Sequence, residues 1–586
     1  MHTLKIQNLP AEINAIYQDT VQMENSAVEA IVKKLLNIIE HLAAENDAQK
    51  IQIQELRDEI NRLKGEQGKP DVKANKKKDG DISSEAERKE AEANANKDVA
   101  TINQESPEET SGKKKKRKRE PKLAKIKIDR EEICYLNKDG LPDDLISKGY
   151  VPVVVQNIII KSDNVKYLRE VYYSLSAHKT YLGDLPQGVK NQGEYGPGIR
   201  TLIPVLKTEC LMTEKRIIGF CQNFGVRISA TYLSQQWTGG YDMFHQERSD
   251  LYRSGIEASH YVQIDDTSAR VNGTNQYCQV VCSPLFTAYF TTPKKDRLSV
   301  LDVLTDFAPP QYLYNQQAQK LLDIFKLAAK ARAAIDACVP FDVVMTEIEF
   351  KANLNTLNSL GPRQRIHFTE ACAIAHYQQQ TEFPIIDKLL ADDAPQFKLL
   401  TQWLGLCWVH DGRHYKKLKP IVPIHQSALT DFRNRYWAYY TELLKFKREP
   451  TLEKKLSLAI EFTELFSTTT GYEDLDDRIA KTLAKNSELL LVLDFPQLPL
   501  HNNEAELGAR VQARVRDVSY QTRSDSGTKI KDTFMTLNQT AKKLGVSFYD
   551  YVHDRVTGLF KLPSLADLII QKGSHCRLER WLHLGI

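Results

Sequence analysis

The sequence lacks cysteine pairs, long apolar runs and an excess of either charge. Its nine cysteines are scattered over 586 residues, and none falls in a CxxC pair. An odd, dispersed set argues against a disulfide framework or a four-cysteine zinc site, and it favours a reducing cytoplasm. No apolar run approaches the roughly 18–20 residues that cross a bilayer. The opening MHTLKIQNLPAEIN also lacks the pattern of a signal peptide, so we expect neither a membrane protein nor a secreted one.

The overall charge is nearly balanced, with 80 Lys and Arg against 76 Asp and Glu, but one segment departs strongly from that balance. Residues 66–121 are poor in apolar side chains and are predicted to be a disordered linker. A block of consecutive cations near its end would seek a polyanion such as DNA, although it could also be merely a solvated charge block. The block consists of Lys113, Lys114, Lys115, Lys116, Arg117, Lys118 and Arg119.

Residues 24–64 contain neither Gly nor Pro and are predicted to form one long helix. Apolar residues recur by threes and fours from Val28 to Leu42, and again from Ile53 to Leu63. This is the a/d seam of a coiled coil, interrupted by a four-residue stutter that holds Asn46. Self-association through residues 1–65 is the favoured interpretation, and packing of this helix on its own domain is the alternative.

The next two segments are predicted to be a small strand-containing domain at 122–194 and a DNA-binding region at 195–250. Strands are expected at 151–160 and 164–173, followed by a helical stretch. Thr213 and Ser229 can each cap a helix, and Gly225 lies between those helices, as in a helix-turn-helix. The residues expected to contact bases are Thr231, Gln235 and Gln236.

Residues 251–310 carry the clearest fold signal. Strands at 260–271 and 276–282 flank Asn272-Gly273, the strongest short hairpin signal, and a third strand at 285–291 precedes a helix. Three antiparallel strands followed by a helix begin a ribonuclease H-like fold. Further strands are expected at 386–391 and 404–409, and helices at 428–490, 503–518 and 528–543.

The predicted architecture is therefore multidomain. An N-terminal coiled coil, a basic linker and a helical DNA-binding region precede an α/β ribonuclease H-like core with helical insertions. The core is divided into 251–310, 381–427 and 494–586, and the insertions are 311–380 and 428–493.

Asp265, Asp392 and Glu506 are acidic residues at strand or helix ends of this core. Carboxylates are hard oxygen ligands, and three together can hold two Mg²⁺ or Mn²⁺ ions for in-line phosphoryl transfer. Each residue also has a simpler interpretation. Asp265 could be an exposed strand-end carboxylate, Asp392 a helix cap, and Glu506 half of a capping pair with Asn503.

Four segments together resemble a known family. They are LLADDAPQF, CWVHDGRHYKKL, LPLHNNEAELGAR and the stretch TRSDSGTKIKDTFMTLNQTAKKLGVSFYDYV. In this order they resemble the DDE transposases of the insertion-sequence-sixty-six family, which belong to bacterial mobile elements. The resemblance covers roughly 195–555 and implies catalytic and metal-binding roles for Asp265, Asp392 and Glu506. It places supporting residues nearby, namely His410, Arg413, His414, Asn502 and Asn503.

The sequence also departs from that family. The zinc ribbon common after the basic linker is not matched, because Cys134 stands alone there. Leu507 follows the glutamate where Arg is usual, and the first two aspartates are 127 residues apart (392 − 265). Cys407, His410 and His414 have ligand-like spacing but no fourth partner, so we do not expect zinc.

Helix geometry favours Glu506 over Glu504 as the third carboxylate. Glu504 shares a predicted core stripe with Leu507, Val511, Val515 and Val518, whereas Glu506 shares a face with Arg510 and Arg514, which could hold DNA phosphate. The resemblance implies a nucleoid-associated transposase that binds terminal inverted repeats and target DNA, with possible accessory proteins of its element. The alternatives are a catalytically silent or partner-dependent DNA-binding protein, and a nuclease or resolvase without strand transfer.

Overall fold

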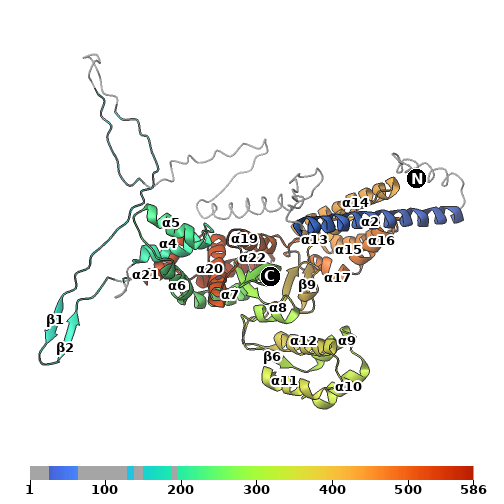
Figure 1. Ribbon diagram of the computed structural model, residues 1–586. Coiled ribbons are helices and arrows are strands. Elements are labelled where there is room, and N and C mark those ends of the chain that lie inside the picture. The colour runs from blue at the N-terminus through green and yellow to red at the C-terminus, as the bar shows by residue number, and fades with distance from the viewer. Residues whose placement is uncertain (1–25, 64–127, 138–148, 187–188, 190–194, 585–586) are drawn as a thin grey trace. The chain divides into compact units, whose positions relative to one another are not determined.

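The computed structural model describes residues 26–63, 128–137, 149–186, 189 and 195–584 (Figure 1). The chain divides into two compact units: one takes in 1–84, 167–219 and 228–586, and the other 85–166 and 220–227. The basic block at 113–119 and the linker that holds it lie outside the described residues.

A mixed five-stranded sheet organises the larger unit. Its strands are β3 (Val262–Val271), β4 (Thr274–Cys282), β5 (Thr287–Thr292), β8 (Lys388–Ala391) and β9 (Trp403–Leu406), in the order β5-β4-β3-β8-β9. The first three are antiparallel, and β8 and β9 run parallel to β3. Asn272 and Gly273 both have positive φ, 45° and 78°, which confirms the predicted hairpin.

Helix α7 (Met243–Ala258) precedes β3, and α8 (Arg297–Leu304) lies between β5 and β8 in the sequence. The helices after β9 include α19 (Asn503–Ser519), α20 (Asp525–Leu544), α21 (Phe548–Thr557) and α22 (Leu565–Leu584). Helix α20 covers the edge strand β5. Asp532, Thr536 and Thr540, spaced by four residues, accept hydrogen bonds from the backbone N–H groups of Thr291, Tyr289 and Thr287 at 2.7, 3.0 and 3.1 Å. One helix face thereby satisfies donors that an open edge would leave unpaired.

Small side chains hold α19 close to the sheet. Its buried positions are Ala505, Gly508, Ala509 and Gln512, and a Cβ at Gly508 would lie 2.7 Å from Val280 Cγ1. The predicted core stripe holds only in part: Val511 and Val515 are partly buried and pack against the core, whereas Val518 is 41% exposed. Close approach to the sheet selects small residues for the buried face, which a hydrophobicity pattern does not reveal.

The insert at 311–380 is mainly helical, as predicted, but it also contains two paired strands. Its elements are β6 (Gln311–Leu313), α9 (Gln316–Ile324), α10 (Ala329–Cys338), β7 (Val344–Thr346), α11 (Glu347–Thr356) and α12 (Pro362–Gln379). The β6–β7 pairing is antiparallel. Each strand has only three residues, too few for alternating polarity to be recognised in the sequence.

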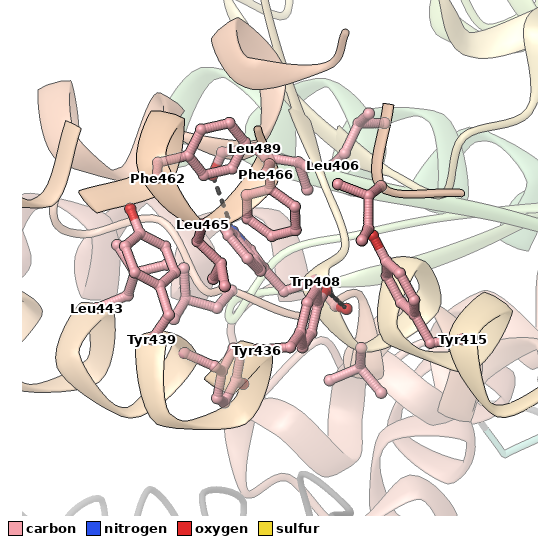
Figure 2. Packing of buried hydrophobic residues seen from close by; sticks show 14 of the residues in the cluster. Leu406, Trp408, Tyr415, Tyr436, Tyr439, Leu443, Phe462, Leu465, Phe466 and Leu489 are labelled. Carbon is pink, nitrogen blue, oxygen red and sulfur yellow. Dashed lines mark hydrogen bonds between the residues drawn. The ribbon is translucent and has the colours of Figure 1, made fainter. Parts of the chain in front are cut away.

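A second core lies among the helices that follow β9. These are α13 (Trp408–Lys417), α14 (Pro423–Arg448), α15 (Leu452–Phe466), α16 (Glu473–Leu483), α17 (Asn486–Leu489) and α18 (Leu491–Asp494). Trp408 is fully buried, donates from its indole N–H to Leu489 O at 2.8 Å, and packs against aromatic rings of α14 and α15 (Figure 2). The predicted strand at 404–409 ends early, because Cys407 caps α13 and the chain turns helical at Trp408.

Helix α2 (Ser26–Leu63) packs on α14 through a face other than the predicted seam. Leu36 is buried with Val422, and the carboxylate of Glu40 accepts from the backbone N–H groups of Ile421 and Val422 at 2.8–3.1 Å. These donors lie at the N-terminus of α14, where a carboxylate is favoured. The seam itself is exposed, including Ile31, Leu35, Ile38, Leu42, Ile53, Leu56, Ile60 and Leu63.

The segment before residue 195 contains less regular structure than predicted. Residues 151–160 form no strand, and of 164–173 only the end enters β1 (Val171–Ser174), which pairs with β2 (Lys179–Leu182) where helix was expected. The side chains at 151–160 are largely exposed, so an apolar, β-branched run is not enough to form a strand without a partner strand.

Three helices follow, α4 (Pro197–Thr208), α5 (Glu214–Asn223) and α6 (Ala230–Gly239). Ser229 caps α6 by accepting from Tyr232 N at 3.1 Å, and Gly225 has φ of 75°, as the sequence predicts. The helix-turn-helix interpretation of α5 and α6 stays a prediction. Across the described part of the chain, no helix is both long and apolar enough to cross a membrane.

The α20 face that covers β5 gives a test of stability. Thr536→Val keeps the shape but removes the acceptor for Tyr289 N–H, which is buried, so we expect a loss of about 1–3 kcal/mol in the free energy of unfolding. Chemical denaturation measures this. Thr463→Val, on the exposed face of α15, is the matched control and should change stability by under about 0.5 kcal/mol. Equal effects at both sites would contradict the role given to Thr536.

Candidate functional site

An open cavity of about 370 Å³ brings the predicted carboxylates together. Asp265 comes from the middle of β3, Asp392 from the residue after β8, and Glu506 from the first turn of α19. His410 and Arg413 of α13 and Arg510 of α19 line the same cavity. Three segments that lie far apart in the sequence therefore meet at one place, as the sequence predicts.

Strand register explains why the two aspartates meet. Val262 pairs with Leu389 and Gln263 with Leu390, an offset of 127 residues. Extending the same offset two residues sets Asp265 level with Asp392 (265 + 127 = 392). Because the strands are parallel, both carboxylates leave the sheet at the same end, where sites form in open α/β sheets.

The two aspartates share a partly buried, acidic environment. Burial, followed by the negative charge of Asp392, raises the pKa of the Asp265 carboxyl to about 7. Burial likewise raises the pKa of Asp392, while His410 opposes that rise. Within the described residues neither carboxylate forms an ion pair with Lys or Arg. Two neighbouring carboxylates without a cationic partner favour binding of a proton or a metal cation between them.

Glu506 is held differently from the aspartates. Its carboxylate accepts two hydrogen bonds from the Arg413 guanidinium, at 3.1 and 3.0 Å. Glu504 instead pairs with Lys543 at 2.7 Å, away from the cavity lining. The geometry therefore favours Glu506 over Glu504 as the third carboxylate. Position decides the choice, because Glu506 lines the cavity beside Arg413 and Glu504 does not.

Neighbouring acids are neutralised by partners of their own. Asp393 pairs with Lys398 at 2.7 Å and with Lys485, and although burial opposes ionisation, these two lysines hold its pKa below the usual value. Asp266 accepts from Gln396 at 2.7 Å and lies 3.6 Å from Lys295. The choice between Asp392 and Asp393, which spacing leaves open, therefore favours Asp392.

Asn502 fixes the start of α19 beside Asp265. It is 1% exposed, donates from Nδ2 to Ile264 O at 2.7 Å, and its backbone N–H donates to Cys407 Sγ at 3.3 Å. Its Oδ1 is buried without a hydrogen-bond partner at the cavity wall. Asn503 begins α19, and no side-chain cap forms there, so the capping interpretation of Asn503 and Glu506 does not apply.

The remaining supporting residues lie on α13. His410 lines the cavity, and its ring is 5.3 Å from that of His414. Burial lowers the pKa of His414 to about 4, so this ring is neutral at pH 7. Cys407 accepts from the backbone N–H of His410, and burial raises the pKa of its thiol to about 11. Cys407 thus acts as a helix cap, a role that ligand-like spacing does not suggest.

The predicted DNA contacts differ in exposure. Thr231 and Gln235 are exposed on α6, and Arg514 is exposed on α19. Gln236 is 8% exposed and shares the buried face of α6 with Leu233 and Trp237. The prediction that Gln236 contacts bases is therefore wrong. The three-residue and four-residue spacing of Leu233, Gln236 and Trp237 could have shown this from the sequence.

Sequence reasoning missed a buried network behind the site. Asp411 is 5% exposed, accepts from Thr482 at 3.0 Å, and pairs with Arg478 and more distantly with Lys485 at 3.9 Å. Lys485 thus connects Asp411 to Asp393, the neighbour of Asp392. The network joins α13 and α16 to the end of β8. Asp411 lies within CWVHDGR. The sequence does not show that it would pair with Arg478, which lies 67 residues further along the chain.

Among the described residues, no three or more His, Cys, Asp and Glu side chains form a ready-made metal-binding group. Asp265 and Asp392 offer hard oxygen donors without an ion-pair partner, and Glu506 could join them only after leaving Arg413. The donor set therefore suits a divalent cation such as Mg²⁺ or Mn²⁺, with Arg413 as the competitor for the third ligand.

Comparison with known proteins finds a relative in Sinorhizobium fredii. The chain is 30% identical over 312 residues to "Uncharacterized protein y4jO" of Sinorhizobium fredii (strain NBRC 101917 / NGR234). The match covers 52% of this chain and 94% of the relative. No protein-family model matches the sequence.

The buried network yields a second prediction. Arg478→Met removes the main partner of Asp411 and leaves a buried carboxylate poorly compensated, so we expect unfolding free energy to fall by about 3–5 kcal/mol. Lys455→Met breaks the more exposed Lys455–Asp494 pair and should cost under about 1 kcal/mol. Thermal and urea unfolding of both variants measure the difference. A similar small loss in Arg478→Met would show that the network does not stabilise this region.

Proposed function

The chain belongs to the same family as protein y4jO, whose name assigns no activity, and we propose from the site itself that it is a DNA transposase. It would bind the terminal inverted repeats of a bacterial insertion sequence, cleave the strand ends, and join them to target DNA. The observation that carries this proposal is the meeting of Asp265, Asp392 and Glu506 at one cavity.

The sheet supports the same proposal. Antiparallel β3–β5, then α8, then parallel β8 and β9 are in keeping with a ribonuclease H-like core. The carboxylates lie on β3, at the end of β8 and on α19, the positions that the resemblance to DDE transposases assigns to them. The helical segments 311–380 and 428–493 would then be insertions into that core.

Bound Mg²⁺ or Mn²⁺ would supply activation of water or a 3′-hydroxyl and stabilisation of the leaving oxygen. In this chain, Asp265, Asp392 and Glu506 would hold the cations. Asn502 keeps α19 in register with β3, so that Glu506 stays close to the aspartates. His410 and Arg510 line the cavity, where Arg510 can neutralise a DNA phosphate.

A wider DNA path is proposed from exposed cations and polar residues. Arg514 lies one turn beyond Arg510 on α19, and Thr231 and Gln235 are exposed on α6. The basic block at 113–119, on sequence grounds, would add contacts with phosphate that carry no sequence information. Together these would let the protein hold element ends and target DNA.

The carboxylates provide the direct test. Asp265→Asn, Asp392→Asn and Glu506→Gln should each abolish magnesium-dependent cleavage of element-end DNA, because an amide is a poor ligand for these cations, while DNA binding stays near wild type. Asp393→Asn is the matched control, since Asp393 is paired with Lys398 and Lys485. Gel assays of cleavage and strand transfer, beside filter binding, measure both properties.

Each alternative has its own outcome in that assay. Cleavage without joining would indicate a nuclease or resolvase, and binding with neither reaction would indicate a silent DNA-binding protein. Full activity in Asp392→Asn would refute the assignment of that residue, and loss in Asp393→Asn alone would move the site by one position.

We also propose that α2 mediates self-association. Its apolar seam is exposed over the described helix, while the opposite contacts through Leu36 and Glu40 hold α2 on α14. A second copy of α2 could cover the seam without displacing α14. The two faces of one helix thus separate attachment within the chain from contact between chains.

Seam substitutions test this proposal. Leu35→Lys combined with Leu42→Lys places charges on the exposed seam, so we expect a lower mass in solution light scattering with little change in thermal stability. The control Leu36→Ala acts on the buried face and should lower stability without lowering the mass. An unchanged mass in the double seam variant would locate self-association elsewhere.

A further inference from the structure

A second cavity, of about 590 Å³, lies along the other half of α19 and does not include the three carboxylates. It is formed by the end of β3, the C-terminal half of α19, the loop to α20, the first turns of α20, and parts of α4, α5 and α6. Its volume lies within the roughly 300–1,000 Å³ that small-molecule sites occupy. None of the residues singled out above for catalysis lines it.

Cations dominate the lining of this cavity. Against one carboxylate, Glu214, the lining contains Lys207, Lys215, Arg270, Arg516, Arg523 and Lys531, a formal charge of +5 (6 − 1). Lys207 is paired with Glu214 at 2.5 Å, and burial lowers its pKa. Burial opposes the charge of Lys531 too, but Asp532 outweighs it and raises the pKa of that ammonium. An anionic ligand is the chemistry that such a lining favours.

Two buried polar atoms in the lining have no hydrogen-bond partner. Arg270 Nε is a donor, and Gln512 Oε1, on a side chain that is 3% exposed, is an acceptor. A buried acceptor that makes no hydrogen bond costs free energy. Gln512 Oε1 therefore suits a ligand that brings an N–H group. The cavity therefore offers a cationic lining for an anion and an unpaired hydrogen-bond acceptor. Inorganic phosphate would use the first but not the second.

Tyr520 stands at this cavity as an aromatic wall. It is 61% exposed, has φ of 60°, and the Arg270 guanidinium lies 5.3 Å from its ring centre. The adjoining loop is fastened to the β3–β4 hairpin: Thr522 N–H donates to Arg270 O at 3.1 Å, and Gln521 Oε1 accepts from Gly273 N–H at 2.7 Å. A strained tyrosine held this firmly is a candidate binding residue.

We propose that this cavity binds a 5′-phosphorylated nucleotide. The phosphate lies among the cations near the start of α20, where Ser524 and Gly527 line the wall. The base stacks on Tyr520, and an exocyclic amino group donates to Gln512 Oε1. That last contact favours adenine, cytosine or guanine, whose amino group projects from the ring, over thymine, whose base donor is the ring N3–H.

The nucleotide could be free or could be the unpaired end of a DNA strand. The second source rests on the proposed function, and the distances suit it: Arg270 is five residues beyond Asp265 on β3, about 16 Å along a strand. That is about four to five base steps of duplex DNA. A strand end held there would keep its duplex within reach of the carboxylates.

Competition binding to the full-length protein tests the proposal. The probe is a labelled, 5′-phosphorylated oligonucleotide, measured by fluorescence polarisation in EDTA so that cleavage plays no part. The competitors are inorganic phosphate, dAMP, dTMP, the unlabelled single strand and its blunt duplex. We expect dAMP or the single strand to compete, dTMP to compete less well than dAMP, and inorganic phosphate to compete weakly.

Three variants locate the binding. Arg523→Gln removes an exposed cavity cation, and Tyr520→Gly removes the ring while relieving its positive φ, so neither endangers the fold. Each should weaken nucleotide binding by about tenfold. Arg363→Gln, an exposed arginine of α12 outside the cavity, removes the same charge and should leave affinity within about twofold.

The outcomes separate the sources and can overturn the proposal. Competition by dAMP as strong as that of the strand identifies a free nucleotide, whereas competition by the strand alone identifies a strand end. Unchanged affinity in both cavity variants, or inorganic phosphate competing as well as dAMP, refutes nucleotide binding here. The assay runs in EDTA and measures binding alone, so failure of the proposed cleavage leaves this result unaffected.

Discussion

Parallel pairing between β3 and β8 is the constraint on which the candidate site depends. Only two residue pairs define the register, Val262 with Leu389 and Gln263 with Leu390. A shift of one residue would turn the side chains of β8 to the opposite face and separate Asp392 from Asp265. The rest of the site is built around that register, because α19 is tied to β3 through Asn502 and α13 begins directly after β9.

The helical segment after β9 contributes stability close to the site. Trp408 is buried among Tyr436, Tyr439 and Phe462, and it follows Cys407, which caps α13 (Figure 2). The same helix presents His410 and Arg413 to the cavity. The segment that resembles a transposase motif is therefore also a structural junction, where a buried aromatic side chain and two residues of the cavity share one helix.

Sequence reasoning succeeded where a local pattern decides local structure. Asn272-Gly273 gives the hairpin, and Ser229 caps α6. It failed where tertiary packing decides. The apolar run at 151–160 forms no strand, and the buried face of α19 carries small residues such as Gly508 because the sheet lies so close.

Long-range charge pairing was equally hidden from the sequence. Spacing could not choose between Asp392 and Asp393, because the decision comes from Lys485, which lies 92 residues beyond Asp393 in the chain (485 − 393). The same holds for Glu40, whose role depends on the backbone of Ile421 and Val422. Partners so distant in sequence have no periodicity, so only the folded chain reveals them.

The arrangement of charges within the site has a final consequence. Asp265 and Asp392 share a partly buried environment without an ion-pair partner, whereas Glu506 is paired with Arg413. Three unpaired carboxylates in one cavity would repel one another, and Arg413 removes the third from that repulsion. On the proposed function, Arg413, which also lines the cavity, could exchange the Glu506 carboxylate for a DNA phosphate, whose two non-bridging oxygens can likewise accept a bidentate pair. Release of Glu506 toward the aspartates and capture of phosphate by Arg413 would then be linked, so that the full carboxylate set forms when DNA is present.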